Sequence, residues 1–126
     1  MKVIDISEAP QAIGPYCHAM KSGNLIFCSG QTPLDPATMT LVGNTIQEQT
    51  AQALQNITVV LSGLGLSLQN VVKTTVFLKD MADFQGMNAV YAQMFGSHTP
   101  ARTTIAVKQN PLDALVEIEC IAEMPE

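Results

Sequence analysis

The sequence predicts a single α+β domain over residues 1–126, and three observations lead to this prediction. Two stretches repeat apolar residues every three or four positions, which is typical of amphipathic helices. Several shorter stretches alternate apolar and polar residues, as half-buried strands do. The length of 126 residues suits one compact domain, with 47% apolar but only 13% charged residues. This low charge predicts that part of the surface forms a subunit interface.

The first expected elements are two short strands that form a hairpin. Residues 17–21 and 25–30 are extended runs, and the turn residues Ser-Gly-Asn at 22–24 separate them at hairpin distance. Residues 31–44 follow as a loop, because Pro33 and Pro36 limit any regular element there.

A long helix is expected next. Thr45 and Glu48 have the spacing of a capping box, and Gly63 and Gly65 mark the end of the helix. The residues at helical spacing between them form one buried face: Ile46, Thr50, Ala53, Leu54, Ile57, Val60, Leu61 and Leu64.

A strand and a second helix follow. In residues 70–80 one face carries Val72, Thr74, Val76 and Leu78, and the other carries Val71, Lys73, Thr75 and Phe77. Residues 80–96 then place Phe84, Met87, Asn88, Tyr91, Met94 and Phe95 on one helical face. Asn88 is the polar member of this stripe, either as a hydrogen-bonding partner of a neighbouring strand or as part of a site.

Two further strands, at residues 101–107 and 114–122, are expected to pair as an antiparallel hairpin. The apolar positions are odd-numbered in the first strand and even-numbered in the second. A shared apolar face then requires registers such as 104 opposite 117 and 102 opposite 119. This pairing predicts that Arg102, Thr104, Glu117 and Glu119 lie together on the other face.

Arg102 is the only arginine in the chain, and the other five basic residues are lysines. A guanidinium binds a planar carboxylate with two parallel hydrogen bonds, which a lysine ammonium cannot do. Arg102 is therefore a candidate site for a small anionic ligand, the alternative being an exposed arginine or a surface ion pair with Glu119. Glu117 and Glu119 are either the solvent face of a sheet or a pair of which one member holds and deprotonates a water molecule.

Composition excludes several classes of function. The net charge of -5 and the pI near 4.8 disfavour nucleic-acid binding, and no basic run suggests an anionic membrane. No apolar window of about 20 residues predicts a membrane span, and no secretory signal is recognisable, so a cytoplasmic protein is expected.

The three cysteines, Cys17, Cys28 and Cys120, are odd in number and show no CxxC spacing, which argues against a disulfide framework and a zinc site. Neither a metal nor an organic cofactor is expected.

Five collinear segments carry a resemblance to a known family. They read "AIGPYCHA", "IFCSGQTPLDP", "NVVKTTVFLKDMADFQGMNAVY", "PARTTIAV" and "LVEIECIA", and they extend over nearly the whole chain. Together they resemble the RidA/YjgF family of enamine/imine deaminases. The resemblance implies a chorismate-mutase-like α+β fold, a mixed sheet with two helices on one face. It also implies a homotrimer with a central β-barrel and a ligand cleft at each subunit interface.

The resemblance also implies roles for individual residues. Arg102 would bind the substrate carboxylate, and Glu117 would position the attacking water. The substrate-binding positions would be Tyr16 from the adjacent subunit, Ser29, Gly30, Asn88 and Thr104. The implied activity is hydrolysis of 2-iminopropanoate and 2-iminobutanoate, the tautomers of 2-aminoacrylate and 2-aminocrotonate, to 2-keto acids and ammonia. The alternatives are a regulatory trimer that binds small carboxylates without catalysis, and a chaperone-like or translation-inhibiting protein.

Two departures from the family pattern concern the cleft. The link from the second helix to Arg102 is short and lacks the aromatic residue often found before Pro-Ala-Arg, so the size of the preferred substrate is open. Cys17 and His18 replace the more usual Ser-Gln after the tyrosine, which affects the rim of the cleft.

Overall fold

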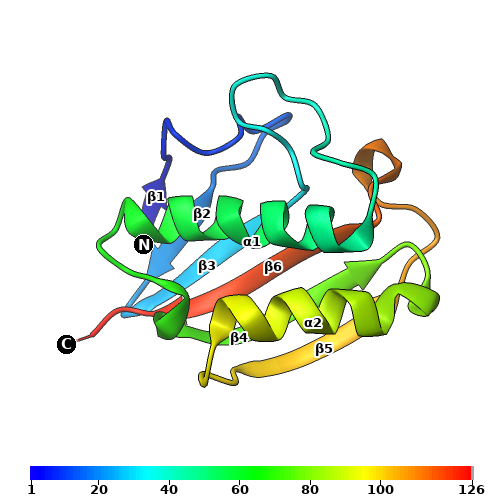
Figure 1. The fold of residues 1–126 in the computed structure, drawn as a ribbon. Coiled ribbons are helices and arrows are strands. Elements are labelled where there is room, and N and C mark those ends of the chain that lie inside the picture. Colours follow the sequence, from blue (N-terminus) through cyan, green and yellow to red (C-terminus); the bar gives the residue numbers. More distant parts are fainter. Residues whose placement is uncertain (126) are drawn as a thin grey trace.

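The computed structural model describes residues 1–125, which form one six-stranded sheet with two helices packed on one face (Figure 1). The helices are α1 (Ile46–Ser62) and α2 (Phe84–Phe95). The strands are β1 (Lys2–Ile4), β2 (Ala19–Ser22), β3 (Leu25–Gln31), β4 (Val71–Leu78), β5 (Ala101–Ala106) and β6 (Val116–Glu123). The predicted α+β fold with a mixed sheet is confirmed.

The strands lie in the order β1-β2-β3-β6-β4-β5. Every neighbouring pair is antiparallel except β4 and β5, which are parallel and connected through α2. A parallel pair needs such a crossover, because a tight turn cannot return the chain in the same direction. The mixed character of the sheet therefore comes from this one β4–α2–β5 unit.

Local signals in the sequence explain the first hairpin and the long helix. Ser22 is paired with Leu25 in the β2–β3 hairpin, and Gly23 takes the left-handed backbone angle that the turn requires, with φ of 61°. The Thr45 hydroxyl accepts a hydrogen bond from the Glu48 backbone N–H at the start of α1. Gly63 caps the other end, as predicted.

Strand β4 differs from the prediction at its first two residues. Thr74, Val76 and Leu78 face the helices as expected. However, a register shift between Val71 and Lys73 turns Val71 into the core, where it is 1% exposed, and leaves Val72 40% exposed. A β-bulge of this kind adds one residue to a strand and so reverses the alternation on one side of it.

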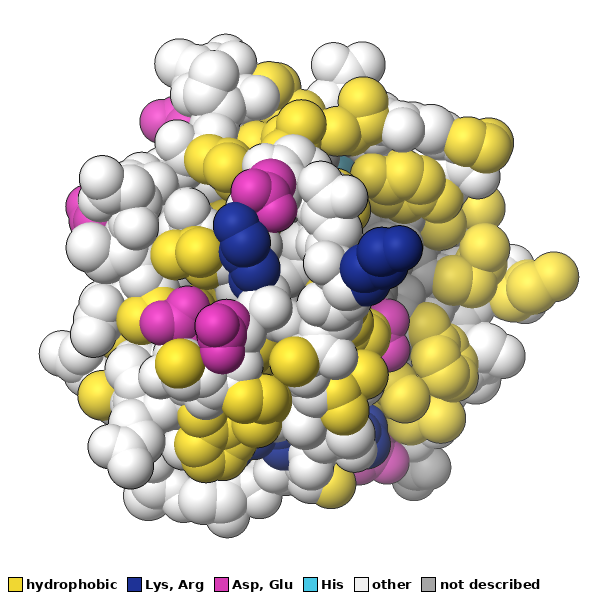
Figure 2. Space-filling view, turned by 90° about the vertical axis from the view of Figure 1, so that its right-hand side faces the viewer, with side chains coloured by type: hydrophobic (Ala, Val, Ile, Leu, Met, Phe, Trp, Pro, Cys, Tyr) yellow, Lys and Arg dark blue, Asp and Glu magenta, His cyan; other side chains and the backbone are white. Residues whose placement is uncertain are grey.

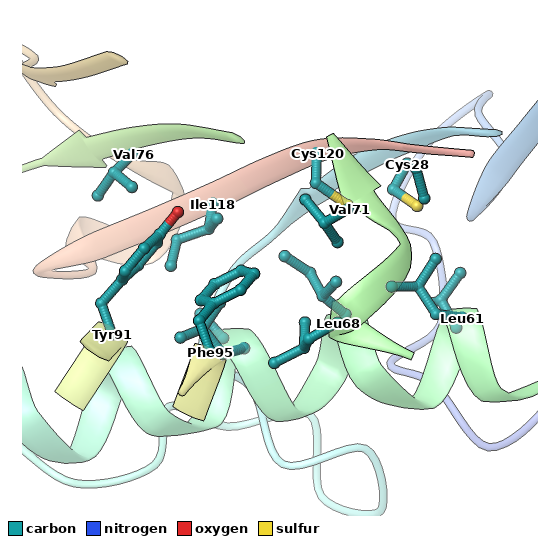
Figure 3. Packing of buried hydrophobic residues seen from close by; sticks show 14 of the residues in the cluster. Cys28, Leu61, Leu68, Val71, Val76, Tyr91, Phe95, Ile118 and Cys120 are labelled. Atoms are coloured by element: carbon teal, nitrogen blue, oxygen red, sulfur yellow. The ribbon is translucent and has the colours of Figure 1, made fainter. Parts of the chain in front are cut away.

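The core lies between the helices and the sheet, and Figure 3 shows its centre. Tyr91 and Phe95 extend from α2 toward the sheet, with ring centroids 4.5 Å apart. Aromatic packing of this kind stabilises a core by about 1 kcal/mol beyond its buried area. Cys28 and Cys120 lie side by side on β3 and β6, where they are paired in register.

The predicted hairpin of the last two strands is wrong, because β4 lies between β5 and β6. Strand β6 has partners on both sides, whereas β5 is the edge strand of the sheet. The physical reason is that β6 alternates strongly apolar residues and suits the sheet centre. Strand β5 carries Arg102, Thr103 and Thr104, which an edge tolerates better.

The sheet face away from the helices has no covering layer within residues 1–125 (Figure 1). It carries large apolar side chains, of which Phe27 and Ile105 are each 43% exposed. In Figure 2 this face lies toward the right-hand edge, where hydrophobic side chains gather.

Neither helix in the described part of the chain combines the length and hydrophobicity that a bilayer crossing requires.

Candidate functional site

Arg102 lies on β5 on the face that carries the helices. It is paired with Thr74, which is completely buried beneath them. Its guanidinium carbon lies 4.8 Å from the ring centroid of Tyr91 and 5.6 Å from that of Phe84. Cation–π contacts at these distances hold the guanidinium in place without neutralising it.

The guanidinium of Arg102 has no carboxylate partner within residues 1–125. The ion pair found there joins Lys79 to Asp113, with 2.9 Å between Nζ and Oδ2. Among residues 1–125 the side chain of Arg102 donates a hydrogen bond only from Nη1 to the sulfur of Met87, over 3.9 Å, which is a weak contact. The surface ion pair with Glu119 considered from the sequence is therefore not formed, and the cation remains available to an anionic ligand.

A cleft of about 360 Å³ lies beside Arg102. The second helix contributes Asn88 and Tyr91 to its wall, and the link to β5 contributes His98, Thr99 and Pro100. The Tyr91 hydroxyl shares a hydrogen bond of 2.7 Å with Thr74, and burial raises the pKa of Tyr91 despite the opposing effects of Thr74 and Arg102. Tyr91 therefore stays neutral and serves as a rigid platform for the guanidinium.

Asn88 and Thr104 both present unsatisfied polar atoms in this region. Asn88 Oδ1 and Thr104 Oγ1 are buried, and neither has a hydrogen-bond partner among residues 1–125. The alternative in which the Asn88 side chain bonds a neighbouring strand is therefore not realised through this oxygen. Buried polar atoms without partners are rare in folded proteins, so both oxygens are candidate contacts for a ligand.

Glu117 lies on β6 on the opposite, open face of the sheet, where it is paired with Phe77. Its Oε1 accepts a hydrogen bond from Thr32 Oγ1 over 3.1 Å. Burial raises the pKa of Glu117, the hydrogen bond from Thr32 lowers it, and the Glu119 carboxylate raises it, with a net upward shift. A carboxylate with a raised pKa is a better proton acceptor than an ordinary glutamate.

Gly30 lies directly against Glu117. A Cβ atom at Gly30 would be 3.0 Å from the carboxyl carbon of Glu117 and 3.1 Å from its Oε2. The absence of a side chain thus lets the carboxylate lie against the backbone of β3. Gly30 and Thr32, the two residues that lie against Glu117, also line a small cavity together with Tyr16.

Ser29 forms hydrogen bonds with the two residues that follow Tyr16 in the chain. Tyr16 is 49% exposed, and its hydroxyl accepts a hydrogen bond from the Ile13 N–H over 3.2 Å. The Ser29 hydroxyl donates to the Cys17 carbonyl over 2.7 Å, and the Ser29 N–H donates to the His18 carbonyl over 2.9 Å. Within the chain, Ser29 therefore anchors the segment that carries Tyr16.

The residues chosen from the sequence form two groups that one chain does not bring together. Arg102, Thr104 and Asn88 are associated with the helix-bearing face. Glu117 lies on the open face, with Gly30 against it. The expectation that Arg102 and Glu117 share a face is wrong, because it rested on direct pairing of β5 with β6.

Sequence reasoning also missed several partners of these residues. Tyr91 and Phe84 were expected only as core residues, yet both rings face the guanidinium of Arg102. Thr32 was expected only as part of a loop, although it bonds to Glu117. Periodicity identifies the buried face of a helix, but it carries no signal for contacts between distant segments.

Comparison with known proteins gives concordant results. Residues 6–124 match the family model described as Endoribonuclease L-PSP. A RutC family protein of Pyrococcus horikoshii is 50% identical over 121 residues, which are 96% of each chain. The chloroplastic Reactive Intermediate Deaminase A of Arabidopsis thaliana is 43% identical over 98% of this chain and 66% of its own. The crystal structure of E. coli TdcF with bound serine has a TM-score of 0.93 at 37% identity, covering 99% of this chain and 100% of that one.

Proposed function

Because the chain belongs to the endoribonuclease L-PSP family, to which the RidA/YjgF proteins also belong, we propose that it is a hydrolytic deaminase of reactive 2-imino acids. The proposed substrates are 2-iminopropanoate and 2-iminobutanoate, which form when 2-aminoacrylate and 2-aminocrotonate tautomerise. The products are the 2-keto acids and ammonia. A relative with 43% identity carries the name of a reactive intermediate deaminase, which supports this class of reaction.

The observation that carries the proposal is the unpaired guanidinium of Arg102. The contacts with Tyr91 and Phe84 hold it in place, and no carboxylate among residues 1–125 forms an ion pair with it. A small 2-imino acid supplies the missing carboxylate, with two oxygens that match the fork of the guanidinium. The bound serine in the TdcF structure is a small amino acid with the same carboxylate, which is consistent with this ligand class.

Glu117 is the proposed general base. Its pKa is raised by burial, and Thr32 fixes one of its oxygens. The carboxylate takes a proton from a water molecule as the water oxygen forms a bond to the carbon of the protonated imine. Glu117 returns this proton to the nitrogen of the tetrahedral adduct, and the C–N bond breaks to release ammonia. Glu117 then takes the proton of the remaining hydroxyl group, which leaves the keto group, and passes it to ammonia or solvent water. Since an iminium carbon is already electrophilic, positioning and a general base suffice and no metal or organic cofactor is required.

The opposite placement of Arg102 and Glu117 supports a site shared by two copies of the chain. We propose the homotrimer that the family resemblance implies, in which each interface combines Arg102, Asn88 and Thr104 of one subunit with Glu117, Gly30 and Tyr16 of the next. The exposed apolar side chains of the open sheet face, including Phe27 and Ile105, would be buried inside such an assembly.

The second candidate is a trimer that binds small carboxylates and regulates a partner without catalysis. The unpaired Arg102 would serve that function equally well. The feature that favours catalysis is Glu117, because a sensor of carboxylates has no need of a carboxylate with a raised pKa. If the protein is a deaminase, Glu117→Gln should keep ligand binding and lose the turnover of the wild type. If it is a sensor, both proteins should bind the ligand without turnover.

The test is an assay in which a pyridoxal-phosphate dehydratase generates 2-aminoacrylate or 2-aminocrotonate in situ. We expect the wild-type protein to accelerate 2-keto acid release over buffer, and Arg102→Ala and Glu117→Gln to lose that acceleration. The matched control is Lys79→Ala, which removes a cation from an exposed ion pair outside the site and should behave as wild type. No acceleration by folded wild-type protein with either substrate would refute the deaminase proposal.

A further inference from the structure

The imidazole of His18 forms hydrogen bonds at both of its ring nitrogens. Nδ1 accepts the Ile6 N–H over 2.9 Å, and Nε2 lies 2.7 Å from the carbonyl oxygen of Pro10. His18 is only 6% exposed, so both bonds are shielded from water. A backbone N–H can only donate and a carbonyl can only accept, so the ring must be neutral with its hydrogen on Nε2.

These two bonds close the segment from Ile6 to His18 into a loop. The backbone of His18 adds a contact to the Asp5 carboxylate over 3.4 Å, and its carbonyl accepts from Ser29 on β3. The segment contains no helix or strand, so the ladder of the sheet does not fix its course. Its side-chain hydrogen bonds to the rest of the fold come from His18 and Ser29, while Ile6 and Ala9 pack against the core.

Tyr16 lies within this loop, two residues before His18. The cavity that contains Tyr16 and Gly30 has His18 in its wall. A second cavity, lined by Tyr16 and by residues such as Asp5, Ile6 and Ala12, also has His18 in its wall. His18 therefore lies at the base of the loop, while the aromatic ring of Tyr16 lies at its exposed rim. We therefore expect a change in the two imidazole bonds to shift Tyr16, since only Cys17 lies between the two residues in the chain.

We infer that His18 is a positioning residue: its neutral, Nε2-protonated ring ties Ile6 and Pro10 to the start of β2 and thereby sets the position of Tyr16 at the subunit cleft. This inference rests on the proposed function, because it takes Tyr16 as a substrate-binding residue. Its physical basis is the shape of imidazole, whose acceptor and donor point in different directions and bridge two backbone groups that a hydrocarbon side chain would leave unpaired.

Three substitutions separate the two bonds. The amide oxygen of His18→Asn occupies the place of Nδ1 and keeps an acceptor for Ile6. The amide nitrogen of His18→Gln occupies the place of Nε2 and keeps a donor for Pro10. His18→Leu keeps neither. Val60→Ala, a cavity-forming change in α1, is the control for loss of stability alone.

Hydrogen exchange and kinetics are then measured on the full-length protein. We expect the Ile6 amide to be protected in the wild type and in His18→Asn, and to exchange faster in His18→Gln and His18→Leu. We expect His18→Leu to raise KM about tenfold with kcat within about twofold of wild type, because loss of both imidazole bonds displaces Tyr16, and the loss of one hydrogen bond from Tyr16 to the substrate corresponds to roughly that factor. His18→Asn and His18→Gln should fall between, and Val60→Ala should leave KM unchanged.

A double-mutant cycle with Tyr16→Phe and Tyr16→Ala tests whether His18 acts through Tyr16. We expect the KM effects of His18→Leu and Tyr16→Ala to be strongly non-additive. Additive effects, or an unchanged KM in His18→Leu, would overturn the inference. If wild-type protein does not deaminate, the proposed function fails. Hydrogen exchange at the Ile6 amide then still tests the bond between His18 and Ile6. The double-mutant cycle is measured instead on the affinity for 2-ketobutyrate, and additive effects there would refute the coupling between His18 and Tyr16.

Discussion

Thr32 donates a hydrogen bond to Oε1 of Glu117 across 3.1 Å, and this bond opposes the upward shift in the pKa of Glu117 that burial and Glu119 produce. Replacement of Thr32 by valine removes the bond at nearly constant volume. The pKa of Glu117 should then rise further, because the ionised carboxylate loses its donor.

The general base must be ionised to accept a proton, so activity should increase as pH rises through the pKa of Glu117. In Thr32→Val this increase should occur at higher pH than in the wild type. The measurement is kcat/KM for imine hydrolysis against pH, with Thr38→Val in the exposed turn of the same loop as control. Identical acidic limbs in wild type and Thr32→Val would exclude Glu117 as the titrating base.

Arg102→Lys keeps the positive charge but loses the planar fork. We expect kcat/KM to fall about 10- to 150-fold, which corresponds to the loss of one charge-assisted hydrogen bond of about 1.5–3 kcal/mol. The fold should be retained, because the guanidinium packs on Tyr91 at the edge of the core and has no buried carboxylate to leave unpaired. Steady-state kinetics with both imine substrates tests this, and unchanged kinetics would contradict the role of Arg102.

Mixed assemblies test whether the site is shared between subunits. Arg102→Ala and Glu117→Gln proteins are each expected to be inactive. After they are unfolded together and refolded at equal concentration, about one quarter of the clefts should combine an intact Arg102 with an intact Glu117 from its neighbour.

We therefore expect recovery of about one quarter of wild-type activity in this mixture. The control mixture combines Arg102→Ala with the Arg102→Ala, Glu117→Gln double variant and should stay inactive, because none of its clefts contains the arginine. If the first mixture also stays inactive although refolding succeeds, Arg102 and Glu117 do not meet across an interface.

Thr50 offers a prediction about stability. It is completely buried in α1, and its Oγ1 has no hydrogen-bond partner among residues 1–125. Thr50→Val replaces the hydroxyl by a methyl group of similar size, so we expect an increase of about 1 kcal/mol in the free energy of unfolding. Denaturant unfolding at fixed protein concentration measures it. Thr58→Val, which removes a 2.8 Å bond to the Leu54 carbonyl, should show no such gain.

The three cysteines should differ in reactivity. Cys17 is partly exposed, whereas Cys28 and Cys120 are buried beside each other in the core. Their mutual hydrogen bond and burial raise the pKa of Cys120, and the same bond lowers that of Cys28. Access should dominate, so mass spectrometry should find Cys17 alkylated first in native protein. Cys17→Ser should remove this fast phase, and early labelling of Cys28 would contradict the expectation.

Several elements could be predicted because their signals are local. The cap at Thr45, the glycine at position 63 and the turn at Gly23 are each read from a few neighbouring residues, and all three are where the sequence places them. The five collinear motifs likewise indicate the family from short stretches of sequence alone. Arg102 can be selected as a candidate from the sequence because it is the only arginine in the chain.

The arrangement of strands was decided only by the tertiary structure. Alternation shows that residues 101–106 and 116–123 are strands, but it contains no information about which strand lies between them. The insertion of β4 moved Arg102 and Glu117 to opposite faces, and the bulge at Val71 reversed a pattern that looked regular. The tertiary structure likewise decided that Tyr91 stacks on Arg102 and that Thr32 bonds to Glu117, because each pair comes from distant segments.

The sequence by itself thus determined the elements, the family and the residues with unusual chemistry, since these depend on side chains and short spacings. The tertiary structure decided which of those residues meet, because strand order depends on the burial of whole faces. In this protein strand order separates Arg102 and Glu117, which direct pairing of the last two strands would have placed on one face, into two half-sites on opposite faces.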